Sequence, residues 1–91
     1  MFLVEHREKC DSPVGEHYDT SVIMLVTTTI DKAREYCEKN RAAELDDDEF
    51  TWSWYEIEKF ELDVEHLTPI STEFWGKLGK MSNRPISGYN R

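Results

Sequence analysis

The chain has 91 residues, of which 38% are hydrophobic and 33% are charged, and its formal net charge is −8 at pH 7. This length fits one domain with a single hydrophobic core and excludes two domains. No apolar run reaches the ~18 residues of a membrane-spanning helix, and the first residues lack the basic and apolar regions of a secretion signal, so we expect a soluble, cytoplasmic protein.

The first part of the chain predicts two strands separated by a long loop. Residues 1–6 begin with an apolar run and suit a strand, whereas residues 7–18 contain Pro13 and Gly15 and suit a polar loop. The next run, residues 22–26, is uninterrupted and apolar, which is typical of a strand buried on both faces. We therefore expect this second strand to lie at the centre of the sheet.

Residues 29–44 change to a helical period, and Thr28 or Thr29 is placed to cap the first turn. The apolar positions of this segment form one narrow stripe. They are Ile30, Ala33, Tyr36 and Cys37. Such a helix needs burial against a sheet for its stability, because isolated helices of this length are marginal in water.

An aromatic strand follows at residues 50–63. Strand alternation places Trp52 and Trp54 on one side and Tyr55 and Ile57 on the other. The alternation then slips, and a β-bulge near residues 58–59 would correct it. Whether this third strand pairs with the first or the second strand stays open.

The last part of the chain predicts a short helix and a tail. Pro69 interrupts the chain, and Ser71 or Thr72 can cap a helix whose apolar residues fall on one side. Those apolar residues are Phe74, Trp75, Leu78 and Met81. The prediction is therefore an α+β fold of order ββαβ: a three-stranded, mainly antiparallel sheet, one principal helix on one face, and a short C-terminal helix. Residues 1–81 form the domain, and residues 82–91 form a flexible tail.

This pattern resembles small uncharacterised bacterial and phage ββαβ domains. The residues that carry the resemblance lie within positions 1–63. They are Thr28, Thr29, Ala33, Tyr36, Tyr55, Ile57, Phe60, Leu62 and Asp63. Because these are core positions, the resemblance implies an architecture and no activity.

The negative charge is concentrated in residues 44–65, which we call the acidic segment. It holds ten acids and one base, Lys59, for a charge of 1 − 10 = −9. Such a charge most often means a solvated face, but regularly spaced strand carboxylates can also imitate the phosphates of nucleic acid. Trp52 and Trp54 are suited to anchor a partner beside them.

The sequence thus suggests a small acidic protein-binding module whose partner is a basic protein surface. A concrete form is a phage-type inhibitor of a nucleic-acid-binding defence enzyme, of the anti-restriction or anti-CRISPR kind, that acts as a DNA mimic. An accessory interaction domain without charge mimicry is the alternative. The expected binding residues are Asp46, Asp47, Asp48, Glu49, Trp52, Trp54, Glu56, Glu58 and Glu61.

Catalysis and metal binding receive less support. His6, Cys10 and His17 could form part of a zinc site, but the short paired spacings of structural zinc sites are absent. Cys10 and Cys37 are expected to be reduced, with Cys37 inside the helix. We expect no catalytic residues, no cofactor, no metal and no direct nucleic-acid binding, and a small metal-dependent enzyme is the weaker alternative.

Overall fold

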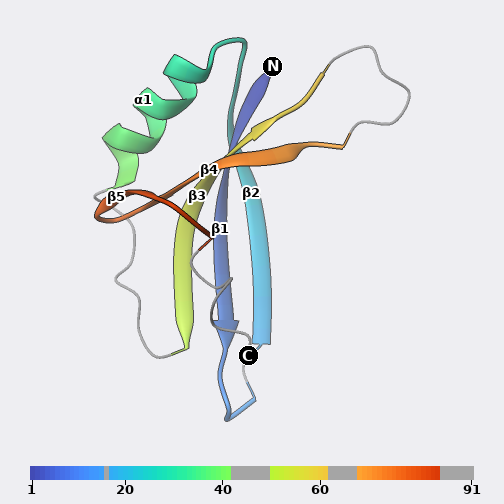
Figure 1. Ribbon diagram of the computed structural model, residues 1–91. Helices are drawn as coiled ribbons and strands as arrows, with labels where there is room; N and C mark the ends of the chain where they lie inside the picture. Colours follow the sequence, from blue (N-terminus) through green and yellow to red (C-terminus); the bar gives the residue numbers. More distant parts are fainter. Residues whose placement is uncertain (16, 42–49, 62–67, 85–91) are drawn as a thin grey trace.

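The computed structural model describes residues 1–15, 17–41, 50–61 and 68–84. It contains one antiparallel sheet of five strands and one helix (Figure 1). The elements are β1 (Phe2–Asp11), β2 (His17–Thr27), α1 (Ile30–Asn40), β3 (Thr51–Lys59), β4 (Ile70–Gly76) and β5 (Gly79–Met81). The α+β class is confirmed, but the prediction of three strands is wrong.

The strands lie in the order β2-β1-β3-β4-β5. β1 is an interior strand, because it pairs with β2 on one side and with β3 on the other. The pairing of β1 with β3 is extended at both ends by backbone hydrogen bonds from Asp11 to Phe50 and from Phe60 to Met1. This answers the open question of strand order. The expectation that residues 22–26 lie at the centre of the sheet is wrong, because β2 is an edge strand.

The first two strands are longer than the sequence predicts. β1 continues to Asp11, through charged residues for which the sequence predicts a loop. Those charges are tolerated in a central strand because most of them find partners there, as described below. The bulge at Val4/Glu5 leaves Met24 of β2 without an opposite residue on β1.

Helix α1 covers one face of the sheet, which we call the helix side. Thr29 is the N-cap, and its side chain accepts a hydrogen bond from the backbone of Lys32. Ala33 and Cys37 are fully buried and pack with core residues of the sheet. The core on this side consists of Val4, Ala33, Cys37, Tyr55 and Ile57, with Phe2, Leu25, Ile30, Tyr36 and Trp75 around it. The predicted helical stripe is confirmed. The helix ends at Asn40 in the structure, and residues 42–44 of the prediction lie outside the described residues.

The predicted C-terminal helix is wrong, because residues 70–81 form the hairpin of β4 and β5. Gly76 pairs with Gly79 across a turn of two residues, and Gly79 has a φ of 124°. A helix over this segment would contain both glycines, each costing about 1 kcal/mol relative to Ala. The hairpin instead uses glycine where a left-handed backbone is required.

Among the residues that the structure describes, no helix has the length and apolar composition needed to cross a membrane. Residues 82–84 follow β5 and bring Arg84 to the sheet. The division of the chain into a domain and a tail stays a prediction, since residues 85–91 lie outside the described part.

Candidate functional site

The face of the sheet opposite the helix carries four of the side chains that the sequence assigns to partner binding: Trp52, Trp54, Glu56 and Glu58. Trp54 is 1% exposed and Trp52 is 8% exposed. They lie opposite Arg7 and Lys9 of β1. Neither indole is therefore presented as an anchor in this structure.

Glu56 is fully buried at the centre of this face. Its Oε1 accepts hydrogen bonds from Trp54 Nε1 at 2.9 Å and from Arg84 Nε at 2.7 Å. Its Oε2 accepts a hydrogen bond from the Ser71 hydroxyl at 2.9 Å and lies 3.4 Å from Arg7 Nε. A buried carboxylate with this many donors is satisfied where it stands, because the arginines replace the water that burial removes. Glu56 thus stabilises the sheet from inside and is not displayed on it.

Glu58 lies beside Glu56 on the same face and is also buried, with 7% of the residue exposed. The pKa of Glu58 is raised to about 7, mainly by burial and further by a hydrogen bond to Glu5 and by the negative charge of Glu5. Its Oε2 is buried and has no hydrogen-bond partner. Near neutral pH, Glu58 is therefore poised between a carboxylic acid and a carboxylate.

Glu5 and Arg7 complete this group, which we call the Glu56 cluster: Glu5, Arg7, Glu56, Glu58 and Arg84. Burial acts to raise the pKa of Glu5, but hydrogen bonds to Glu58 and Ser21 and the charge of Arg7 outweigh it and lower that pKa. For Arg7, burial is outweighed by the charges of Glu56 and Glu5, which raise its pKa. Three carboxyl groups and two guanidinium groups are electrically balanced when Glu58 holds a proton.

The same cluster contains the carboxylates with spacing suited to a metal ion. Glu5, Glu56 and Glu58 each bring one oxygen within 4.8 Å of the others. The oxygens of Glu56 already accept hydrogen bonds, and Arg7 lies 2.9 Å from Glu5. The positive charge that these carboxylates require is thus supplied by the protein itself.

The remaining predicted binding residues divide into two groups. Glu61 is exposed, as the prediction requires. Asp46, Asp47, Asp48 and Glu49 lie outside the described residues. The acidic segment therefore has buried members in β3 and one exposed member just after β3 among the residues that the structure describes.

Another buried carboxylate was not singled out from the sequence. Glu73 of β4 is 5% exposed and faces the helix side, where it accepts hydrogen bonds from Arg34 Nε at 2.8 Å and Trp75 Nε1 at 3.1 Å. Burial acts to raise the pKa of Glu73, but these bonds and the charges of Arg34 and Lys80 lower it. Glu73 therefore ties α1 to β4. The alternation of β4 was the signal that could have found it, but the helical interpretation of this segment concealed it.

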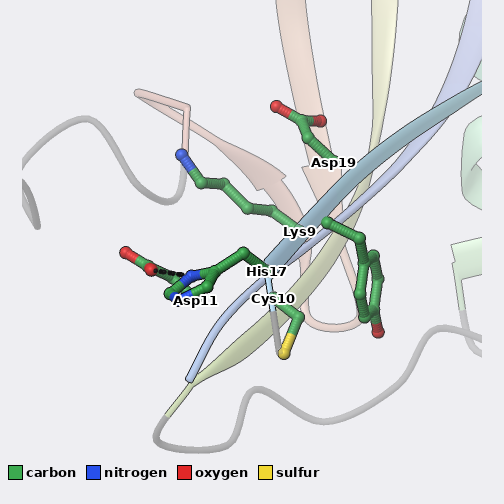
Figure 2. A pocket seen from close by; sticks show the side chains of 6 residues that line it. Lys9, Cys10, Asp11, His17 and Asp19 are labelled. Atoms are coloured by element: carbon green, nitrogen blue, oxygen red, sulfur yellow. Dashed lines mark hydrogen bonds and ion pairs between the residues drawn. The ribbon is translucent and has the colours of Figure 1, made fainter. Parts of the chain in front are cut away.

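A shallow pocket of about 310 Å³ lies at the hairpin end of β1 and β2 (Figure 2). His17 Nδ1 and Asp11 Oδ1 lie 2.7 Å apart across the hairpin. Cys10 is buried, and its sulfur points away from the His17 ring in Figure 2, because Cys10 and Asp11 are consecutive in a strand and face opposite sides. His6 lies on the side of Cys10 and packs against Tyr55. The three residues considered for zinc are therefore not brought to one point.

Among the described residues, five of the eight exposed large hydrophobic side chains lie on β2. Every residue from His17 to Met24 is exposed. The exposed fractions are 55% for Val22, 59% for Ile23, 42% for Met24 and 51% for Val26. Because β2 is the last strand on its side among the described strands, its outer edge also carries backbone N–H and C=O groups that the pairing with β1 does not use. Beside this strand, a groove of about 350 Å³ is lined by Leu25, Lys32, Glu35, Tyr36 and Lys39.

No protein-family model, curated protein or solved structure matches the chain.

Proposed function

We propose that this protein is a protein-binding module that binds by adding a partner strand to β2. The observation that supports the proposal is the long, exposed outer edge of β2, the last strand on its side among the described strands, with its apolar run at residues 22–26. Such an edge is a template for another strand, and proteins usually protect it with charges, prolines or a covering segment. From Thr20 to Thr27, β2 has no charged residue and no proline.

The chemistry of the edge favours a strand over a compact surface. Main-chain hydrogen bonds would provide affinity, and apolar side chains on both faces of β2 would provide contacts above and below the new strand. Val22 lies opposite His6 and Ile23 opposite Glu5, so the two side chains point to different faces. A partner strand would therefore bury apolar surface on both sides at once.

Affinity capture from a cell extract, with this protein immobilised, tests this proposal. The double variant Val22→Lys/Ile23→Lys should lose the retained protein, because lysines on an edge strand oppose strand addition. The matched variant Asp47→Asn/Glu61→Gln leaves β2 intact and should retain it. Retention should also survive an increase in salt, since apolar and main-chain contacts are not screened. Retention of the same protein in equal amount by wild type and by the β2 variant would contradict the proposal.

A second candidate is the acidic inhibitor that presents a phosphate-like surface to a basic, nucleic-acid-binding defence enzyme. Its support is the charge of −9 over residues 44–65. With Glu56 and Glu58 buried, this surface would rest on the acids of residues 46–49 together with Glu61. The same capture experiment separates the candidates, because here the acid variant should lose the partner and salt should weaken binding steeply.

A further inference from the structure

The part of β2 that can accept a new strand in a regular ladder is His17–Ile23. This segment pairs without interruption with β1, and the irregularity at Val4/Glu5 follows it. All of its residues are exposed. A bulge bends a strand and disturbs the next ladder, so a strand added to β2 should pair with this segment first.

We propose that the strand that binds here is β2 of a second copy of the same chain, antiparallel, with Thr20 of one copy opposite Thr20 of the other. This inference rests on the proposed function and names its partner. The register follows from the segment itself, because pairing about Thr20 uses the whole of His17–Ile23 in both copies. Identical surfaces related by a two-fold axis form such an interface without any further element.

The side chains of this register are complementary. Its cross-strand pairs are Tyr18 with Val22, Thr20 with Thr20, Asp19 with Ser21, and His17 with Ile23. Aromatic with β-branched pairs and Thr with Thr pairs are favourable across antiparallel strands. Asp19 is the one acid in β2, and it lies opposite a serine, so no like charges face each other. A register centred on Asp19 would instead place two carboxylates together.

The described helix and strands are compatible with this pairing. An antiparallel junction between two edge strands has its two-fold axis perpendicular to the sheet, so both copies keep α1 on the same side. The two five-stranded sheets then become one continuous sheet. Tyr18 and Val22 are 40% and 55% exposed in the single chain, and both would be covered on the helix side by their counterparts.

The net charge gives this interface an unusual dependence on salt. Two copies that each carry −8 repel each other at long range, while the contacts between the two β2 strands are main-chain hydrogen bonds and side-chain pairs in which no two like charges lie opposite each other. Added salt screens the repulsion, so the dimer should become stronger as salt rises from about 0.05 M to about 0.5 M. A complex with a basic partner would become weaker over the same range.

Sedimentation equilibrium between about 5 and 500 µM tests the proposal, with Thr20→Lys and Thr20→Glu beside wild type. Wild type should show a monomer–dimer equilibrium. Each variant alone should dissociate at least about tenfold more readily, because equal charges then face each other across the axis. An equal mixture of the two variants should reassociate, since opposite charges then meet. Leu78→Lys and Leu78→Glu, at a position that is 97% exposed in the β4–β5 turn, should leave the equilibrium unchanged.

Circular dichroism of each variant checks that the sheet is intact. A wild type that stays monomeric throughout, or a dimer that Thr20→Lys does not weaken, overturns this inference. So does a mixture that fails to reassociate. A monomeric wild type that still retains a host protein, and loses it in Val22→Lys/Ile23→Lys, overturns the second-copy inference and leaves the proposed function in place. If the β2 variant also retains that protein, both proposals fail.

Discussion

Glu58 is a carboxyl group that the fold protects from water and places beside another carboxyl group, Glu5. Two neighbouring acids cannot both ionise cheaply in a buried site, so one of them keeps its proton to a higher pH. The arginines of the Glu56 cluster balance the other two carboxylates. A sequence that looks uniformly acidic here therefore contains a cluster that is close to neutral near pH 7.

This arrangement predicts how stability depends on pH. The folded pKa of Glu58, about 7, lies above its ordinary value of 4.5, so the folded state favours the protonated form. The corresponding stability is fully present below pH 4.5 and is lost as pH rises through 7. We expect the free energy of unfolding to fall by on the order of 1–3 kcal/mol between pH 5.5 and pH 8 because of this group. Glu5 and Glu73, whose pKa values are lowered, act in the opposite direction and only in the acid range.

Urea denaturation at several pH values measures this effect, with Glu58→Gln as the comparison. Glutamine keeps the shape of the protonated acid and cannot ionise, so the variant should show a flatter dependence between pH 5.5 and 8. An equally steep fall in the variant would mean that another group causes it.

Arg84 is predicted to stabilise the sheet although it follows the last strand. It donates to Glu56 at 2.7 Å and lies over the ring of Phe74, 5.6 Å from its centroid. Arg84→Gln should lower the free energy of unfolding by about 1–3 kcal/mol, because it leaves a buried carboxylate with one charged donor fewer. The control is Lys32→Gln, on the exposed surface of α1, which should change stability little. Equal stability of the two variants in urea would show that Arg84 is not needed to balance Glu56.

The composition of β2 suggests an interior strand and that of β1 an edge strand, but the structure has the reverse. β2 contains the most apolar run of the chain and lies at the edge, whereas β1 contains Glu5, Arg7 and Lys9 and lies in the centre. Hydrophobic patterning reports which residues gain from burial, but it does not report which strand will pair on both sides. Here the charged strand β1 lies between β2 and β3, and its Arg7 contacts both Glu5 of β1 and Glu56 of β3. Such cross-strand charge pairing could not be read from either strand alone.

For the β4–β5 hairpin, the sequence predicts the wrong type of secondary structure, a helix in place of two strands. Its apolar residues recur at helical spacing, but the glycines at positions 76 and 79 fit a two-residue turn. By contrast, the predicted cap, stripe and start of α1 are confirmed, since these depend on local spacing. Local patterns were sufficient for the helix, for β3 and for the opposite orientations of Trp54 and Tyr55.

The turn gives a prediction for a single glycine. Gly79→Ala should lower the free energy of unfolding by about 1–2 kcal/mol, because a φ of 124° is unfavourable for any residue with a Cβ atom. No atom lies within 4 Å of the added Cβ, so the effect should come from the backbone alone. Leu78→Ala, one residue earlier and almost fully exposed, should leave stability unchanged in the same urea titration. An unchanged stability in Gly79→Ala would indicate that the turn relaxes without cost.

For the whole molecule, the position of the charge matters more than its amount. The chain carries −8, yet Glu56 and Glu58 of the acidic segment are buried, and Glu56 is paired with Arg7 and Arg84. Most of the exposed large hydrophobic side chains in the described residues lie on a different strand, β2. The sequence points to the acidic segment because charge can be read from the residues themselves, whereas the position of β2 at the end of the described sheet follows only from the strand order.

Amide hydrogen exchange at low and high protein concentration tests the central claim, that the outer edge of β2 is where this protein binds. If a second copy adds to this edge, amides of residues 17–23 that point away from β1 should exchange freely in dilute solution and become protected as the concentration rises. Protection in β3, β4 and β5 should stay the same. Concentration-dependent protection in β4 or β5 with none in β2, or no change in any strand while sedimentation shows a dimer, would contradict the claim.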